Sequence, residues 1–205
     1  MQNLAKFISA FFFPSTWALF GTYFALYKDN NVYFAIGETN YYFFIFVLLY
    51  LILPLGLLMV GKKSVKLKVI SLPKRESRHI YLFIFAVYFL LIYSFFRGDI
   101  SPFIEVSLLA SSITFCIAFV VNLKVKASLH MMGLLGFIAQ MIYFFSMNNH
   151  LSTYWLLIFT IFVPIVLWSR LFLKAHTLIE TIYGSILGLF INGIVFYLYY
   201  GLPSY

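Results

Sequence analysis

Residues 102–121 read PFIEVSLLASSITFCIAFVV, a stretch with a single charged residue, Glu105. A helix that crosses the hydrocarbon core of a membrane needs about 20 mostly apolar residues, and this stretch has that length. A transmembrane β-strand would instead alternate apolar and polar residues over about ten positions. The stretch therefore predicts a helix that spans a bilayer.

Further apolar runs lie on both sides of this stretch. Hydrophobic residues make up 63% of the 205-residue chain and the mean hydropathy is +0.98, which is more apolar surface than a soluble domain of this size buries. An N-terminal run, 7–27, contains FFFPSTW, and its proline indicates a broken or re-entrant helix. The sequence thus predicts an all-α, polytopic transmembrane helical bundle with six spans plus this N-terminal seventh or re-entrant segment. The six spans are expected at 41–60, 80–96, 102–121, about 129–145, 151–168 and 181–200.

The loops indicate how the chain is divided and oriented. All connections are short except 61–79, so we expect residues 1–205 to form a single integral membrane domain. If the runs alternate sides, twelve of the 14 Lys and Arg residues fall on one side, and only Lys28 and Arg97 fall on the other. The positive-inside rule places the basic side in the cytoplasm. The basic 61–79 loop would also attract anionic lipid headgroups, at roughly 1 kcal/mol per basic residue.

Two polar segments stand out near the ends of these runs, NLKVKASLH (122–130) and WSRLFLKAHTLIE (168–180). A charge at the centre of a spanning helix costs about 2.5–3.5 kcal/mol, so we expect both segments at the basic membrane face. His176 and Glu180 are four residues apart and would share one helix face. A carboxylate in that place can hold the proton of one imidazole nitrogen and leave the other for a substrate, which suits the histidine to nucleophilic attack.

The same two segments supply groups that bind phosphate. Arg170 offers a planar fork that matches two phosphate oxygens, and His130 adds a second histidine. Further donors come from Ser169, Ser128, Lys126 and Lys124. Two histidines beside several cations are typical of phosphoryl transfer through a phosphohistidine, in which one histidine attacks and the other protonates the leaving oxygen.

Each of these residues also has a plainer explanation. A lysine or arginine at the end of a span is usually a topological anchor, which is how we interpret Lys174. A glutamate in the first turn of a helix is favoured by the helix dipole, and an isolated histidine is more often structural than catalytic. His130, His176 and Glu180 could hold a metal ion, but the surrounding cations oppose a divalent ion. We therefore expect no metal and no other cofactor.

The motifs resemble those of a known family. SRLFLKAHTLIE resembles the third motif of the type-2 phosphatidic acid phosphatase superfamily, S-R-x-x-x-x-x-H-x-x-x-D, with a glutamate in place of the aspartate. ASLH at 127–130 resembles the second motif, P-S-G-H, and the first motif, K-x-x-x-x-x-x-R-P, is absent as written. The pattern K-x-S-x-H-x-x-G at 126–133, together with FFFPSTW and KRESR, resembles a divergent bacterial branch of the superfamily.

This resemblance covers about residues 100–200, which would form the catalytic core. It implies a metal-independent phosphatase of lipid phosphates or pyrophosphates in a bacterial inner membrane. In it His176 is the nucleophile, Glu180 orients it, and His130 is the general acid. The expected partners are a lipid phosphate substrate and membrane lipids, with no nucleic acid. The implied phosphate-binding residues are Arg170, Ser169, Ser128, Lys126 and, in the place of the missing first motif, also Lys124.

Three points stay open at this stage. A lipid headgroup phosphotransferase would use the same site, and a non-catalytic anionic-lipid binder or transporter would use the same cations. The identity of the lipid is not encoded in any motif. The active site is expected on the basic, cytoplasmic face, although many bacterial relatives act on the opposite, periplasmic one.

Overall fold

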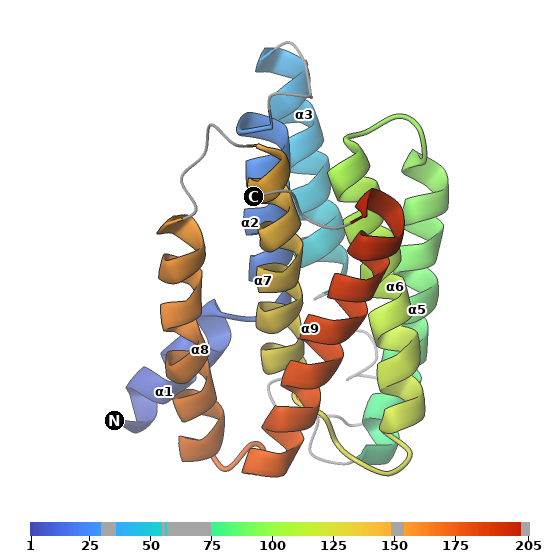
Figure 1. Cartoon of the computed structure of the whole chain (residues 1–205). Coiled ribbons are helices and arrows are strands. Elements are labelled where there is room, and N and C mark those ends of the chain that lie inside the picture. Colours follow the sequence, from blue (N-terminus) through green and yellow to red (C-terminus); the bar gives the residue numbers. More distant parts are fainter. Residues whose placement is uncertain (30–35, 55, 57–74, 149–153, 202–205) are drawn as a thin grey trace.

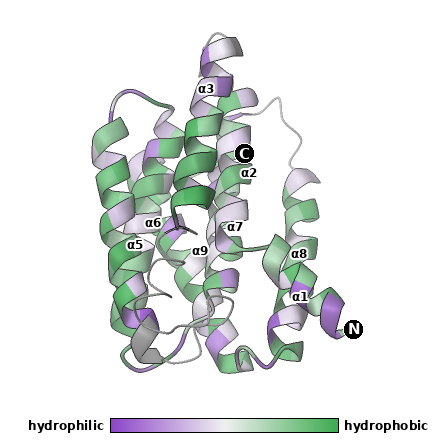
Figure 2. Cartoon of the chain, turned by 180° about the vertical axis from the view of Figure 1, so that it is seen from behind, coloured by the Kyte–Doolittle hydropathy of each residue, from purple (hydrophilic) through white to green (hydrophobic). Residues whose placement is uncertain are grey.

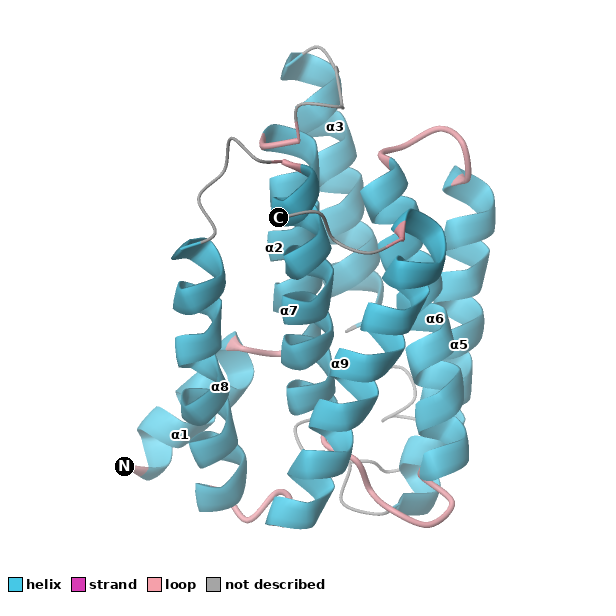
Figure 3. Cartoon of the chain, viewed as in Figure 1, coloured by secondary structure: helices cyan, strands magenta, loops and turns pink. Residues whose placement is uncertain are grey.

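The structure is a computed structural model that describes residues 1–29, 36–54, 56, 75–148 and 154–201. Within these residues the chain forms helices and no strands, as expected for an all-α bundle (Figure 1, Figure 3). The helices are α1 (Gln2–Phe11), α2 (Pro14–Tyr27), α3 (Ile36–Val47), the π-helix η1 (Leu48–Ile52), α5 (Arg75–Phe96), α6 (Pro102–Val121), α7 (Leu129–Met147), α8 (Tyr154–Phe172) and α9 (Leu178–Tyr200).

Among the described residues, five helices are long and apolar enough to cross a membrane, namely α5, α6, α7, α8 and α9. The number rises to six if α1 and α2 together form one bent span. The expected count of six spans plus an N-terminal segment is therefore not confirmed. The run at 41–60 accounts for the difference, because Gly37–Ile52 forms a helix shorter than a span and residues 57–60 lie outside the described part.

The break expected at the N-terminal proline is present. Helix α1 ends at Phe11 and α2 begins at Pro14, with a bend of 45° between them. Proline suits the first position of a helix because its missing N–H would have no partner there in any case. The bend lets α1 turn aside and lie against α8, as Figure 1 shows at the N-terminal end of the chain.

Helix α7 is the centre of the bundle. Within its spanning window 78% of the residues are buried, against 22–39% for the other four long helices. It packs against α2, α8 and α9, while α5 pairs with α6. Large apolar side chains such as Phe95 and Leu198 are exposed on the outer helices, and green predominates along the long helices in Figure 2. Such surfaces fit contact with lipid rather than with water.

Helices α7 and α9 approach each other very closely at two glycines of α9. A Cβ atom added to Gly184 would lie 2.3 Å from the Ser128 carbonyl oxygen, and one added to Gly188 would lie 2.2 Å from the Met132 carbonyl oxygen. Glycines four residues apart allow this kind of contact between membrane helices. The close approach fixes the start of α7 against the start of α9, where the Ser128 N–H donates to the Glu180 carbonyl at 3.0 Å.

The two polar segments found in the sequence meet at one end of the bundle. The α6–α7 connection, the α8–α9 turn and the beginning of α5 all lie at the lower end in Figure 1. We call this end the basic end; its described basic residues include Arg78, Lys124, Lys126, Arg170 and Lys174. Lys28 and Arg97 follow helices that end at the opposite side.

Candidate active site

The turn between α8 and α9 places His176 beside its carboxylate. The Ala175 N–H donates to the Arg170 carbonyl and the Lys174 N–H donates to the Leu171 carbonyl, the two hydrogen bonds of a Schellman motif. Lys174 occupies the left-handed position of that motif, with φ 49°, where glycine is usual. Its side chain is exposed, in keeping with an anchor rather than a site residue.

Glu180 serves both the helix and the histidine. Its Oε2 atom lies 3.0 Å from His176 Nδ1 and accepts from the Thr177 N–H at 3.1 Å. Thr177 in turn caps α9 by accepting from the Glu180 N–H at 3.3 Å, which completes a capping box. One oxygen atom of Glu180 therefore serves both as part of the helix cap and as the hydrogen-bond partner of His176.

The electrostatics of this pair favour a neutral imidazole. The side chain of His176 is only 6% exposed. Burial, followed by the positive charges of Arg78, Arg170 and Lys126, holds the pKa of His176 well below its usual range. The neutral ring then carries its proton on Nδ1, which donates to Glu180, and Nε2 is left with its lone pair.

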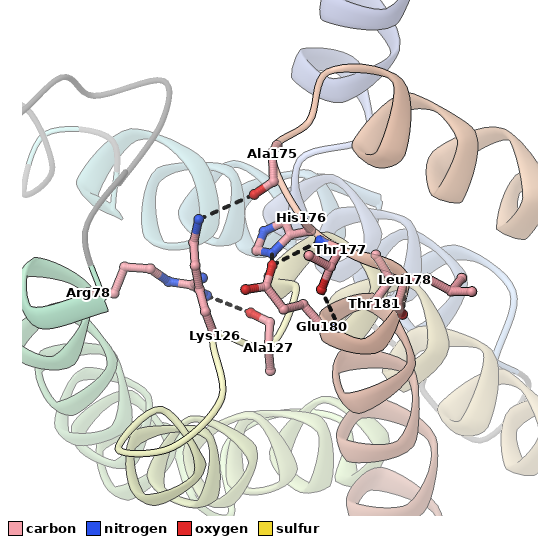
Figure 4. Close-up of polar contacts among 9 residues, drawn as sticks. All are labelled: Arg78, Lys126, Ala127, Ala175, His176, Thr177, Leu178, Glu180 and Thr181. Atoms are coloured by element: carbon pink, nitrogen blue, oxygen red, sulfur yellow. Dashed lines mark hydrogen bonds and ion pairs between the residues drawn. The ribbon is translucent and has the colours of Figure 1, made fainter.

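Two cations hold the loop before α7 in place: Lys126 connects this loop to the α8–α9 turn, and Arg78 connects α5 to the loop (Figure 4). Lys126 Nζ donates to the Ala175 carbonyl at 3.2 Å, and the Arg78 guanidinium donates to the Ala127 carbonyl at 2.7 Å. Arg78 is 3% exposed. Burial, with the positive charge of Arg78 next in size, lowers the pKa of Lys126.

A second part of the site is formed by α1, α7 and α8. His130 Nε2 lies 2.9 Å from the Ser9 carbonyl oxygen and donates to it, so the neutral ring carries its proton on Nε2. The Arg170 guanidinium donates to the Ser9 hydroxyl. The ring of Phe13 packs edge-on against His130 with 5.8 Å between ring centroids. Ser9 therefore connects the two residues expected to protonate the leaving group and to bind phosphate.

Two buried polar atoms of this cluster have no hydrogen-bond partner among the residues that the structure describes. They are the Ser128 hydroxyl oxygen and Arg170 Nε. Leaving a buried donor unsatisfied costs about 1–3 kcal/mol, so such atoms call for an explanation. Both residues belong to the cluster that contains Arg78, Lys126 and the carboxylate of Glu180, and an anion with several oxygen atoms is a ligand that accepts from such donors.

The predicted site residues are not all placed alike. The structure gathers His176, Glu180, His130, Lys126, Ser128 and Arg170 at the basic end. Ser169 is fully buried, but its hydroxyl donates to the Val166 carbonyl at 2.8 Å, so its proton is already used within α8. The side chain of Lys124 is exposed, and it is not among the cations that act on His176.

No family model, curated protein or solved structure matches this chain. The resemblance to the phosphatidic acid phosphatase superfamily therefore stays a prediction that rests on the motifs alone.

Two members of the cluster are missing from the sequence-based prediction. Arg78 belongs to the KRESR stretch, which had a resemblance but no assigned role beyond topology. Nothing in the sequence around Ser9 singles it out. In the part of the chain that the structure describes, no three His, Cys, Asp or Glu side chains come close enough to hold a metal ion.

Proposed function

We propose that the protein is a membrane-embedded lipid phosphate phosphatase that works through a phosphohistidine. One observation carries the proposal. Buried donors without a partner, on Ser128 and Arg170, lie in one cluster with the neutral His176. Glu180 contacts Nδ1 of that ring and not Nε2. The donors fit a phosphate group, and the histidine fits a nucleophile.

The first chemical step is attack by His176 on phosphorus. The Nε2 lone pair forms the new N–P bond while the bond between phosphorus and the lipid oxygen breaks. Glu180 accepts the Nδ1–H hydrogen bond and stabilises the positive charge that develops on the imidazole ring. Arg170, Arg78 and Lys126 offset the charge on the phosphate oxygens, where fixed donors act with little reorganisation.

His130 supplies the proton for the leaving oxygen. In its protonated form it gives that proton to the lipid alkoxide, and it later takes one from the water that attacks the phosphohistidine. Phosphate is then released and His176 returns to its neutral state. In the structure the Ser9 carbonyl takes the hydrogen bond of His130 Nε2, so α1 has to give way before a leaving oxygen can accept it.

The position of the cluster supports a lipid as the substrate. It lies at one end of apolar helices long enough to cross a membrane, where the phosphate of a lipid would also lie.

The basic end is assigned to the cytoplasm on the positive-inside rule. Two exposed positions test that assignment in a Cys116→Ser background: Lys124→Cys should react with an impermeant thiol reagent only in opened cells, and Arg97→Cys in intact ones. The reverse pattern would place the site outside.

The activity is tested by phosphate release from lipid phosphates by the purified protein in lipid nanodiscs. His176→Ala and His130→Ala should each abolish release while remaining monodisperse. His79→Asn is the matched control, because His79 stacks on Phe119 with 3.8 Å between ring centroids and has no role in the proposed chemistry. Substantial turnover by His176→Ala would end the proposal.

Two other results would redirect it. Transfer of phosphate or headgroup to an added lipid alcohol, in place of free phosphate, would identify a phosphotransferase with the same site. Saturable phosphate binding that depends on Arg170, without any turnover, would identify a non-catalytic anion binder.

A further inference from the structure

A narrow cavity of about 120 Å³ runs inside the bundle between α2, η1, α5, α6, α7 and one residue of α9. It is distinct from the polar cluster, because none of the cluster's histidines or charged residues lines it. No Lys, Arg, Asp, Glu or His side chain appears among its described lining residues. A charged group placed there would lack a counter-charge, so the cavity suits an uncharged ligand.

One end of the cavity reaches the candidate active site. Leu129 and Gly133 line it, and they lie in the same turn of α7 as His130. Phe13 also lines it and contacts the His130 ring. Gln140, another lining residue, is ten positions further along α7, about 15 Å from His130 at 1.5 Å per residue. The cavity therefore extends from the proposed general acid into the depth of the bundle.

The walls of the cavity are of two kinds. Aromatic rings, including those of Phe85, Phe89 and Phe137, form an apolar wall. Ser107, Ser111 and Thr114 of α6 contribute hydroxyls, but each donates to the carbonyl four residues earlier in its own helix. These hydroxyls thus require no partner from a ligand, and a hydrocarbon chain can lie against them.

We propose that this cavity binds the first few carbon atoms of the substrate's hydrocarbon chain, and that the substrate is a single-chain lipid phosphate. The inference rests on the proposed function for the position of the phosphate headgroup. With its phosphate in the cluster, the chain passes His130 and enters the cavity rather than staying in the bilayer. A cavity of about 120 Å³ is slightly smaller than one that encloses a benzene ring, so it holds only the first few carbon atoms of one unbranched chain. The glycerol and two acyl chains of a phosphatidic acid do not fit in it.

The test fills the cavity without touching the polar cluster. Ser111→Leu places a bulky side chain in the cavity, and Ser94→Leu is its matched control on α5. Both serines donate to the carbonyl four residues earlier, at 2.8 and 2.9 Å, but Ser94 is exposed. Gly21→Ala is a milder filling variant, because its added Cβ would have only ordinary contacts, the nearest 3.8 Å from the Phe137 ring.

Turnover is compared for dodecyl phosphate, methyl phosphate and a two-chain phosphatidic acid in nanodiscs. The wild-type protein should prefer dodecyl phosphate to phosphatidic acid. Ser111→Leu should lower kcat/KM for dodecyl phosphate about tenfold, which is about 1.4 kcal/mol, because the leucine side chain takes the place of the substrate's carbon atoms. Gly21→Ala should lower it less. Both should leave the turnover of methyl phosphate unchanged, because it has no chain to enter the cavity. Equal effects of Ser111→Leu and Ser94→Leu, or a wild-type preference for phosphatidic acid, would overturn the inference.

A binding measurement separates this inference from the proposed function. Dodecyl phosphate that carries a photoreactive diazirine on one of the first carbon atoms of its chain should label peptides of α6 and α7 that line the cavity. Ser111→Leu should suppress that labelling and Ser94→Leu should not. Cavity labelling without any turnover would leave the inference standing and remove the phosphatase. Turnover with labelling confined to the outward faces of the helices would do the opposite.

Discussion

Replacing Glu180 by Gln would separate the charge of this residue from its geometry. The glutamine oxygen can still accept from His176 Nδ1 and from the Thr177 N–H, which lie 3.0 and 3.1 Å from the present Oε2 atom. Glutamine is also accepted in a capping box. What is lost is the negative charge facing the imidazole ring as that ring becomes positive in the transition state.

The size of the effect follows from the hydrogen bonds involved. A hydrogen bond to a charged group contributes about 1.5–3 kcal/mol and a neutral one about 0.5–1.5 kcal/mol. The difference of about 1–1.5 kcal/mol corresponds to a roughly tenfold lower kcat. Glu180→Ala removes the whole interaction and should lower kcat about 100-fold, at 2–3 kcal/mol. KM should change little in both variants, because the charge acts mainly in the transition state.

Thr177→Ala is the control, measured in the same steady-state phosphate-release assay. It removes the side-chain cap that accepts from the Glu180 N–H, which costs about 1 kcal/mol of helix stability, and it leaves the His176–Glu180 pair intact. Its kcat should match the wild type. A wild-type kcat for Glu180→Gln, or an equal loss in Thr177→Ala, would show that Glu180 serves only as a helix-capping residue.

Three further predictions concern the surroundings of the site. Because burial and neighbouring cations lower the pKa of Lys126, this lysine loses its charge at a lower pH than an ordinary lysine. Lys126→Arg should therefore move the alkaline limb of the kcat/KM profile to higher pH. An unmoved limb would mean that this charge does not bind the substrate. Ser9→Ala removes the hydroxyl that now accepts from the Arg170 guanidinium. The freed guanidinium should tighten inhibition by vanadate about fivefold, for one hydrogen bond of about 1 kcal/mol. Weaker inhibition would show that the Ser9 hydroxyl itself helps to bind phosphate. Gly184→Ala puts a Cβ 2.3 Å from a backbone oxygen and should lower the unfolding temperature and the activity, whereas Gly193→Ala, with no atom within 4 Å of its added Cβ, should change neither.

The sequence predicted the bounds of a helix well where a proline marks one end of an apolar run. Residues 102–121 form α6 with these same bounds, since Pro102 opens the helix at its first position. The break before Pro14 was predicted for the related reason that proline lacks a backbone donor. The expected run at 41–60 is described only in part, as the helix Gly37–Ile52, and residues 55 and 57–60 lie outside the described residues.

Some contacts of the candidate site join residues close together in the sequence, and others depend on how distant helices pack. The pairing of His176 with Glu180 is local, but it does not come from the shared helix face that their spacing predicted. His176 lies in the turn before the N-cap Thr177, and the capping box of α9 turns the Glu180 carboxylate back toward it. The parts played by Arg78 and Ser9 depend on where α5 and α1 pack, which no local pattern reveals. One long-range signal was present in the sequence: the two glycines of GSILG at 184–188 indicate a close helix contact, and they fix α9 against the start of α7.

The most direct test of the proposed chemistry is to trap the phosphorylated enzyme. Dodecyl phosphate carrying radioactive phosphate is mixed with the protein in nanodiscs, quenched within the first turnover, and the labelled peptides are identified. We predict an acid-labile, alkali-stable phosphohistidine at His176, absent in His176→Ala and unchanged in His79→Asn. Steady release of phosphate with no label on His176, or a label that persists on another residue in His176→Ala, would contradict the assignment of this histidine as the nucleophile.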